Sequence, residues 1–288
     1  MKFSVCPTMI PPEQLLSVAR AADESGWNGF ALPDSVFYVE KVTVPYPYSE
    51  DGERHWAPEA PFVDPLAAFP AMAAVTQRLF FFSNVLKAPL HQPLLLAKNV
   101  GSMASLFPGR IGLGLGTSWI PQEFEWVSED MRNRGKRLNE MIEIMRLCMQ
   151  GGWAEFHGEF YDFDRLMMSP WPSEPVPLYV GGHAPAALHR AAELGDGWLS
   201  ASSDPEYLEG VIPQMEADRA DSAMAGVPFE VIAMAQTPPP LDLVLRLEEI
   251  GVDHIVIIPT TYGMDASVEA RCDAVKRYAA NVIQAYQG

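Results

Sequence analysis

The sequence lacks any apolar run long enough to cross a lipid bilayer. Its most continuous runs, such as HIVIIP at 254–259, are far shorter than the roughly 20 residues that a membrane-spanning helix needs. The chain begins with the strand-like segment KFSVC, without the charged and apolar regions of a secretory signal. We therefore expect no membrane partner and a cytoplasmic location.

Cysteine is scarce, with three residues that lie far apart: Cys6, Cys148 and Cys272. No CxxC motif occurs, so a disulfide framework is excluded and small buried apolar roles are expected for the three thiols. The six histidines show no HxH or HxxxH spacing and form no cluster with cysteine, so no metal site is expected. A G-x-S-x-G motif, which would indicate an acyl-transfer serine, is also absent.

Basic residues are few relative to acidic ones. Lys and Arg number 20 and Asp and Glu number 37, which gives a net charge of −17. Such a surface repels nucleic acid and anionic membranes, and no basic cluster opposes this repulsion. The expected partner is a small-molecule substrate.

Strand-like and helix-like segments alternate along the chain. Continuous apolar strands, typical of a parallel sheet covered on both faces, are expected at 2–6, 29–35, 79–88, 110–118, 177–182, 197–202, 229–236 and 254–259. Helices are expected at 11–26, 65–77, 92–107, 134–150, 184–195, from 205 onward, and at 241–251 and 267–287. Eight such repeats predict an α/β fold, a (β/α)8 TIM barrel, with residues 1–288 as a single domain. An open doubly wound sheet is the alternative, but the first turn, CPTMIPP, lacks the glycines that this fold uses.

Two segments depart from the repeat. An insertion follows the second strand, from Val36 to Asp64, and it is rich in aromatic residues and proline. A loop this long tends to be functional, so it is expected either to form an apolar substrate pocket over the barrel mouth or to pack onto the barrel. A hairpin excursion is expected at 155–172, after the fourth helix.

The carboxyl ends of barrel strands carry the active site in this fold. They place Asp34, Lys87, Ser118, Ser202 and the segment 259–261 at the mouth. Asp34 either serves the chemistry or caps the loop that follows it. Lys87 either faces an anionic cofactor or substrate or forms a salt bridge at the rim.

Two glycine patterns lie at this end of the barrel. Gly181 and Gly182 join a strand to a helix, followed by His183, and free amides at such a turn bind anions, although a tight turn alone also needs glycine. In GRIGLGLGTSW, from Gly109, the alternate glycines include Gly114 and Gly116. Neither register fits the dinucleotide fingerprint. The pattern therefore indicates a strand face without side chains, which either lies against a planar cofactor or packs closely inside the barrel.

Several blocks resemble the bacterial luciferase-like monooxygenase superfamily. They are ESGWNGFALPDS, NVLKAPLHQPLLLAKNVGSMASLFPGRIGLGLGTSWIPQEF, RGKRLNEMIEIMR, FHGEFYDF and PLYVGGHAPAALHRAAELGDGWL. The similarity is greatest to the actinobacterial branch that uses the deazaflavin coenzyme F420, and it covers the chain from Met1 to about Trp198.

The resemblance implies where a cofactor would lie. A deazaflavin or flavin ring is expected against the third and fourth strands, in contact with Asp34 and the segments 84–85 and 114–117, which hold Asn84, Val85, Gly114, Gly116 and Thr117. The cofactor phosphate is expected at Gly181, Gly182 and His183. Many members have a cis peptide bond that does not involve proline in the third strand, and the matching pair here is Asn84 and Val85. Lys87 and Arg110 are candidates, by position alone, for holding the anionic tail of F420.

The sequence departs from the sugar-phosphate dehydrogenases of this superfamily. Those enzymes have Asp-His after the second strand, where this chain has Asp34 and Ser35, and a catalytic glutamate after the fourth strand, where it has Trp119. The next polar residues are Gln122 and Glu123. The proton-transfer chemistry of the sugar-phosphate dehydrogenases therefore cannot be carried over to this chain. The catalytic candidates are Asp34, Gln122 and Glu123.

The favoured function is hydride transfer between bound F420 and an organic substrate that is partly apolar. An FMN-dependent monooxygenase is the alternative, and a flavin- or deazaflavin-binding protein without turnover is a second one. A barrel lyase or isomerase is a weaker interpretation, because the sequence offers no Schiff-base lysine or metal set. A homodimer is common in the superfamily and is a candidate assembly here, although the sequence leaves the oligomeric state open.

Overall fold

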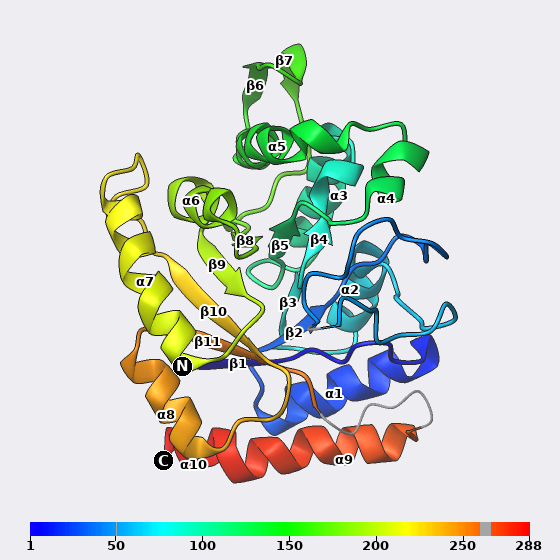
Figure 1. Ribbon diagram of the computed structural model, residues 1–288, viewed down its shortest axis with the longest axis vertical. Helices are drawn as coiled ribbons and strands as arrows, with labels where there is room; N and C mark the ends of the chain where they lie inside the picture. Colours follow the sequence, from blue (N-terminus) through cyan, green and yellow to red (C-terminus); the bar gives the residue numbers. More distant parts are fainter. Residues whose placement is uncertain (50, 260–265) are drawn as a thin grey trace.

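The computed structural model describes residues 1–49, 51–259 and 266–288. Figure 1 shows strands surrounded by helices, with the two chain ends close together. The parallel strands in the described residues are β1 (Lys2–Val5), β2 (Gly29–Leu32), β3 (Phe80–Ser83), β4 (Leu86–Lys87), β5 (Leu113–Gly116), β8 (Leu178–Gly181), β9 (Gly197–Ser200), β10 (Glu230–Ala235) and β11 (His254–Ile257). The predicted site residues Thr260 and Thr261 lie outside the described residues.

The α-helices follow the strands in the expected order. They are α1 (Leu15–Ser25), α2 (Pro65–Ala73), α3 (Pro93–Leu106), α4 (Pro121–Trp126), α5 (Arg134–Met149), α6 (Pro185–Leu194), α7 (Pro205–Ala220), α8 (Leu241–Glu249), α9 (Val268–Tyr278) and α10 (Gln284–Gln287). Short 3-10 turns are η1 (Pro12–Gln14), η2 (Ala88–Leu90) and η3 (Met131–Asn133), and the π-helical η4 (Ala279–Ile283) joins α9 to α10.

Side-chain caps explain several helix starts. Asp64 Oδ1 accepts a hydrogen bond from Leu66 N at 2.7 Å at the start of α2. Asp204 Oδ1 accepts one from Glu206 N at 3.1 Å and confirms the predicted start of α7. Such caps satisfy amide groups that have no partner inside the helix.

The strands form a parallel barrel, as predicted. Their order is β3-β2-β1-β11-β10-β9-β8-β5-β4. A bridge between Phe81 and Ile111 joins β3 to the chain just before β5, through hydrogen bonds from Phe81 N to Arg110 O at 2.8 Å and from Gly112 N to Phe81 O at 2.9 Å. The fold is therefore the (β/α)8 TIM barrel.

One predicted strand is divided. The sequence pattern predicts a single strand over 79–88, but the segment forms β3 and β4 with Asn84 and Val85 between them. The peptide bond that joins these two residues is cis, as the resemblance implied. β3 pairs with β2 and β4 pairs with β5, so the two halves face different neighbours.

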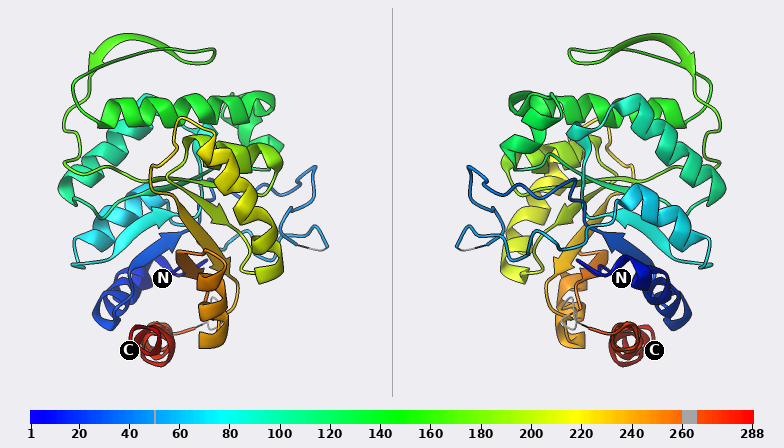
Figure 2. Two further views of the ribbon diagram at one scale, coloured as in Figure 1. Left: turned by 90° about the vertical axis from the view of Figure 1, so that its left-hand side faces the viewer. Right: turned by 90° about the vertical axis from the view of Figure 1, so that its right-hand side faces the viewer.

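The two excursions take different forms. β6 (Trp153–His157) and β7 (Asp162–Met167) form the predicted antiparallel hairpin, which extends beyond α5 at one end of the molecule (Figure 2). The described residues between β2 and α2 contain no helix or strand. We call residues 36–64 the mouth loop, and Figure 2 shows it standing out from one side of the molecule.

A polar cluster fills the barrel interior near the amino ends of its strands. Glu230 Oε2 accepts a hydrogen bond from Tyr179 Oη at 2.8 Å, and Glu230 Oε1 lies 3.0 Å from Lys2 Nζ and 3.4 Å from His254 Nδ1. His254 Nε2 lies 2.7 Å from Ser4 Oγ. Burial alone would raise the pKa of Glu230, but His254, Lys2 and Tyr179 lower it from 4.5 to about 2. The charged carboxylate is therefore favoured in the folded chain.

This shift predicts a dependence of stability on pH. Because the folded pKa of Glu230 lies below its unfolded value, the stabilisation is present above about pH 4.5 and is lost as the pH falls toward about 2. We expect Glu230→Gln to lower the free energy of unfolding by on the order of 2 kcal/mol at neutral pH. Urea unfolding of both proteins along a pH series should show this difference shrinking below about pH 4.5. Glu216→Gln, at an exposed position of α7, is the control, and a difference that stays constant with pH would contradict the prediction.

Candidate functional site

The predicted mouth residues at the ends of β2 and β4 lie together. Asp34 Oδ2 accepts a hydrogen bond from Lys87 N at 2.9 Å, so the carboxylate ties the two strand ends to each other. Burial raises the pKa of Asp34, and the bond from Lys87 opposes that rise. The contact gives Asp34 a positioning role toward β4.

Lys87 forms a buried ion pair with Glu123. Its Nζ donates to Glu123 Oε1, and Ser118 Oγ donates to Glu123 Oε2 at 2.6 Å. Glu123 is fully buried and Lys87 is 9% exposed. Of the two roles considered for Lys87, the structure therefore shows the salt bridge. Both oxygens of the catalytic candidate Glu123 are engaged.

The third catalytic candidate, Gln122, holds the mouth loop. Its Nε2 donates to Lys41 O at 3.0 Å. Gln122 and Glu123 lie on the short helix α4, which was not predicted. The pattern PQEF has proline at the first helical position, and this was the available signal for a helix start.

Asn84 and Val85 lie between β3 and β4, and both have side-chain neighbours from other strands of the barrel. The Asn84 side chain donates to Met234 Sδ at 3.2 Å. It also bonds the thiol of Cys6, whose pKa burial raises to about 12. Val85 fills the space beside two glycines, because a Cβ on Gly116 would meet Val85 Cγ2 at 2.5 Å and one on Gly181 would meet Val85 Cγ1 at 2.7 Å.

The glycine strand does not present an open face. A Cβ on Gly114 would lie 2.2 Å from both Ser83 O and Leu199 Cδ1. At Gly114 and Gly116 glycine makes room for neighbouring protein atoms, which is the close packing inside the barrel that the sequence offered as the alternative to a cofactor wall. Contact of these glycines with a cofactor ring stays a prediction. Thr117, at the end of β5, is partly exposed.

The turn between β8 and α6 is the predicted anion cradle. Gly182 has a φ of +125°, and a Cβ there would lie 2.9 Å from Ala187 Cβ. Ala184 precedes α6 and its methyl group cannot cap the helix, which begins with Pro185. Pro185 has no N–H and Ala187 N donates to Ala184 O at 2.8 Å, so among the first three positions of α6 the amide of Ala186 is left for another partner.

His183 is held in an aromatic environment. Its Nε2 accepts a hydrogen bond from Ala201 N at 2.8 Å, so the proton of the neutral ring is on Nδ1. The ring stacks on Tyr207, with centroids 5.2 Å apart, and lies 5.8 Å from the ring of Trp198. Burial lowers the pKa of His183, which favours the neutral ring.

Aromatic side chains of the mouth loop connect the ends of β5 and β8. The ring of Tyr46 lies 5.3 Å from Trp119, 5.2 Å from Trp56 and 5.7 Å from Tyr48. Tyr48 in turn lies 6.2 Å from His183. We call Tyr46, Tyr48, Trp56 and Trp119 the mouth cluster. It crosses from one strand end to another, as expected for a loop over the mouth.

Two cations suggested for an anionic tail are engaged elsewhere. Arg110 donates to Leu79 O at 2.9 Å and to Thr76 Oγ1 at 2.6 Å, before β5 and thus at the opposite end of the barrel from the mouth. Lys87 is paired with Glu123. Neither is free to hold the tail.

His91 is a mouth residue that the sequence pattern did not indicate. It lies close enough to Asp34 for its charge to lower the pKa of that carboxyl. Its Nε2 is buried and has no hydrogen-bond partner among the described residues. No spacing motif links 34 to 91, so the barrel alone brings these residues together.

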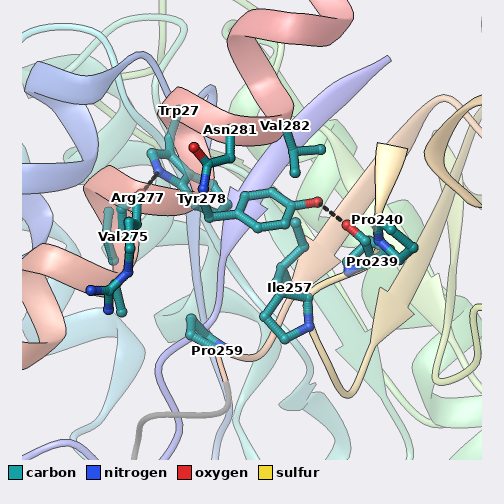
Figure 3. Close-up of a pocket in the computed structure, with 12 residues that line it drawn as sticks. Trp27, Pro239, Pro240, Ile257, Pro259, Val275, Arg277, Tyr278, Asn281 and Val282 are labelled. Carbon is teal, nitrogen blue, oxygen red and sulfur yellow. Dashed lines mark hydrogen bonds between the residues drawn. The ribbon is translucent and has the colours of Figure 1, made fainter. Parts of the chain in front are cut away.

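A cavity of about 330 Å³ lies between α9 and the segments that follow β10 and β11. Figure 3 shows it between α9 and the prolines before α8, with Tyr278 Oη donating to Pro239 O at 3.0 Å. It is lined mostly by apolar side chains and carries no cluster of reactive groups. The strand ends, rather than this cavity, therefore define the candidate site.

Residues 1–49, 51–259 and 266–288 offer neither a metal site nor a membrane span. No group of three or more His, Cys, Asp or Glu side chains in these ranges is placed to hold a metal ion. No helix in them is both long and apolar enough to cross a membrane.

Relatives share the sequence over its length. A protein of Mycobacterium tuberculosis described as uncharacterized is 38% identical over 287 residues, which cover 98% of this chain and 99% of the relative. An F420-dependent glucose-6-phosphate dehydrogenase of Nakamurella multipartita is 29% identical over 211 residues, 71% of this chain and 57% of that protein.

Solved structures share the fold. An F420-dependent secondary alcohol dehydrogenase, in complex with an F420–acetone adduct, aligns with a TM-score of 0.75 and 16% identity over 98% of this chain and 99% of that one. The monooxygenase RslO1 of Streptomyces bottropensis aligns with a TM-score of 0.79 and 16% identity over 99% and 100% of the two chains. Residues 4–238 match the family described as luciferase-like monooxygenase. The chain therefore belongs to the luciferase-like monooxygenase family.

Proposed function

We propose that this protein transfers a hydride between bound coenzyme F420 and a small organic substrate. The observation that carries the proposal is the Gly181–Gly182–His183 turn, which leads into α6 without a side-chain cap. Relatives named as F420-dependent and solved F420-dependent enzymes of the same fold support the choice of cofactor.

The residues at the turn fit the phosphate of such a cofactor. The amide of Ala186 at the start of α6 and the Nδ1–H of His183 are donors at this turn. Gly182 lets the turn lie close against Ala187 of α6. We assign the phosphate to Gly181, Gly182 and His183. Asn84 and Val85, with Thr117 nearby, would contact the ring.

The cofactor supplies the two-electron chemistry when it is bound, and the chain binds, orients and shields it. Asp34 fixes β4 through Lys87 N, and β4 continues from Val85. Gln122 holds the mouth loop through Lys41 O, which helps to keep water from the mouth. Gly114 and Gly116 allow Ser83, Leu199 and Val85 to pack closely in the barrel interior, and Val85 would face a bound ring from this packing.

The second candidate is an FMN-dependent monooxygenase. The phosphate cradle suits FMN equally well, and a monooxygenase shares the fold over almost the whole chain. An assay of oxygen consumption with reduced FMN separates this function from hydride transfer. If the protein bound a cofactor but showed no turnover in either assay, the third candidate, a flavin- or deazaflavin-binding protein, would be favoured.

Replacing Gly182 tests the cradle. We expect Gly182→Val to weaken F420 binding about tenfold or more, because its Cβ would lie 2.9 Å from Ala187 Cβ and a backbone φ of +125° is strained for valine, so the turn and the start of α6 would shift. Fluorescence titration with F420 gives the affinity, and circular dichroism verifies that the barrel is folded. Gly226→Val is the matched control, since Gly226 also has positive φ but follows α7 in open space. If the folded Gly182→Val protein bound F420 with unchanged affinity, the assignment of the phosphate to this turn would be refuted.

A further inference from the structure

The mouth cluster offers ring faces and edges to a substrate. Tyr46, Trp56 and Trp119 are partly exposed, and Tyr48 is 54% exposed. Tyr46 meets Trp56 edge to face and lies tilted toward Trp119. Aromatic rings favour partners that are themselves flat and apolar.

The charge at the same mouth is neutralised. Within two residues of the carboxyl ends of the barrel strands in the described part of the chain, Lys87 is the only lysine or arginine. Its ammonium group is paired with the fully buried Glu123, which Ser118 also bonds. Asp34 lies at the same strand end and adds negative charge. At the strand ends Lys87 is paired with Glu123 and His91 lies beside Asp34, so an anionic substrate that loses its hydration here meets cations that already have a carboxylate neighbour.

We propose that the site takes a neutral, ring-bearing hydride acceptor and rejects substrates that carry a phosphate or a carboxylate. This inference rests on the proposed hydride transfer and names the substrate class of that site. Glu123 is the positioning residue for this choice, because it acts on substrate charge through Lys87. The mouth cluster supplies the contacts to the ring.

A matched pair of enones tests the proposal. Benzalacetone is neutral, and para-carboxybenzalacetone adds one carboxylate to the same skeleton. With reduced F420 the enone gains a hydride at its β-carbon and a proton from water at its α-carbon, while F420 becomes oxidised. We expect the F420-loaded protein to bind benzalacetone about tenfold or more tightly than the carboxylate, by isothermal titration. Equal or tighter binding of the carboxylate, or binding of neither, would overturn the proposal.

Two variants test whether the preference for the neutral enone depends on the ion pair between Lys87 and Glu123. Glu123→Gln should expose the charge of Lys87 and tighten binding of the carboxylate about tenfold, without changing the F420 dissociation constant. Glu125→Gln, on the exposed side of the same helix, should change the binding affinity of neither the carboxylate nor F420. If a folded Glu123→Gln protein bound para-carboxybenzalacetone no more tightly than the native protein does, the role of the ion pair would be contradicted.

Tyr46→Ala keeps the test independent of the buried ion pair. It should weaken benzalacetone binding about tenfold and leave F420 binding intact. Phe37→Ala is its control, because Phe37 stacks on Trp126 outside the mouth cluster. F420 binding is measured first on every protein: failure to bind F420 overturns the proposed function as well, whereas F420 binding without the ligand preference overturns only the substrate class.

Discussion

Gly114→Ala is expected to lower the free energy of unfolding by about 3 kcal/mol, the upper end of the usual cost of overpacking a core. The new methyl group would lie 2.2 Å from Ser83 O and from Leu199 Cδ1. Leu199 could turn aside, but Ser83 O is backbone. Ser83 Oγ also donates to Gly114 O at 2.8 Å and accepts from Gly114 N at 3.1 Å, so β3 and β5 cannot separate without breaking these bonds.

Chemical denaturation measures this effect, with Gly210→Ala as the control. Gly210 lies in α7, and apart from its chain neighbours and the backbone of its own helix, a methyl group added there would meet no atom of the described residues within 4 Å. Alanine should therefore be neutral or stabilise by up to about 1 kcal/mol. If Gly114→Ala were as stable as the native protein, the close packing of the barrel interior at this strand would be refuted.

Shortening the mouth loop is expected to reduce kcat/KM for the hydride acceptor at least a hundredfold, or about 2.7 kcal/mol of transition-state stabilisation. The mouth cluster would lose Tyr46, Tyr48 and Trp56 together, and water would reach the strand ends. F420 binding should change little, because the cradle belongs to β8 and α6. Steady-state kinetics and an F420 titration on the same protein separate the two effects.

The β6–β7 hairpin provides the control for loop shortening. Its turn, residues 158–161, lies on the far side of α5 from the barrel (Figure 2), where Glu140 accepts hydrogen bonds from Glu159 N at 2.7 Å and Tyr161 N at 3.0 Å. Replacing that turn with Asn-Gly should leave both kcat/KM and F420 binding unchanged. A shortened mouth loop with normal turnover would show that residues 36–64 serve only to pack against the barrel.

The fold was predictable because its signals are local. Continuous apolar strands, capping residues such as Asp204 and prolines at helix starts recur along the chain. The division of strand 79–88 was not visible in that pattern, because β3 and β4 are distinguished by their neighbours β2 and β5 rather than by composition.

The site was predictable only in outline. The barrel rule placed Asp34, Lys87 and the Gly181–Gly182 turn at one end, and the structure confirms those positions. The partner of Lys87 could not be predicted, since Glu123 lies 36 residues away on a helix that was not foreseen. Likewise, alternate glycines give the same sequence pattern whether a cofactor or Val85 occupies the space beside them. The single domain, the homodimer and the cytoplasmic location stay predictions.

The most direct test of the central claim is a fluorescence titration of the purified protein with oxidised F420 and with FMN. Both cofactors carry a phosphate for the cradle at Gly182, so the comparison reports on the rest of the cofactor. We expect F420 to bind at least about tenfold more tightly, a difference of about 1.4 kcal/mol, and reduced F420 to be consumed when a hydride acceptor is added. Tighter binding of FMN, or binding of neither cofactor, would contradict the assignment of this protein as an F420-dependent hydride-transfer enzyme.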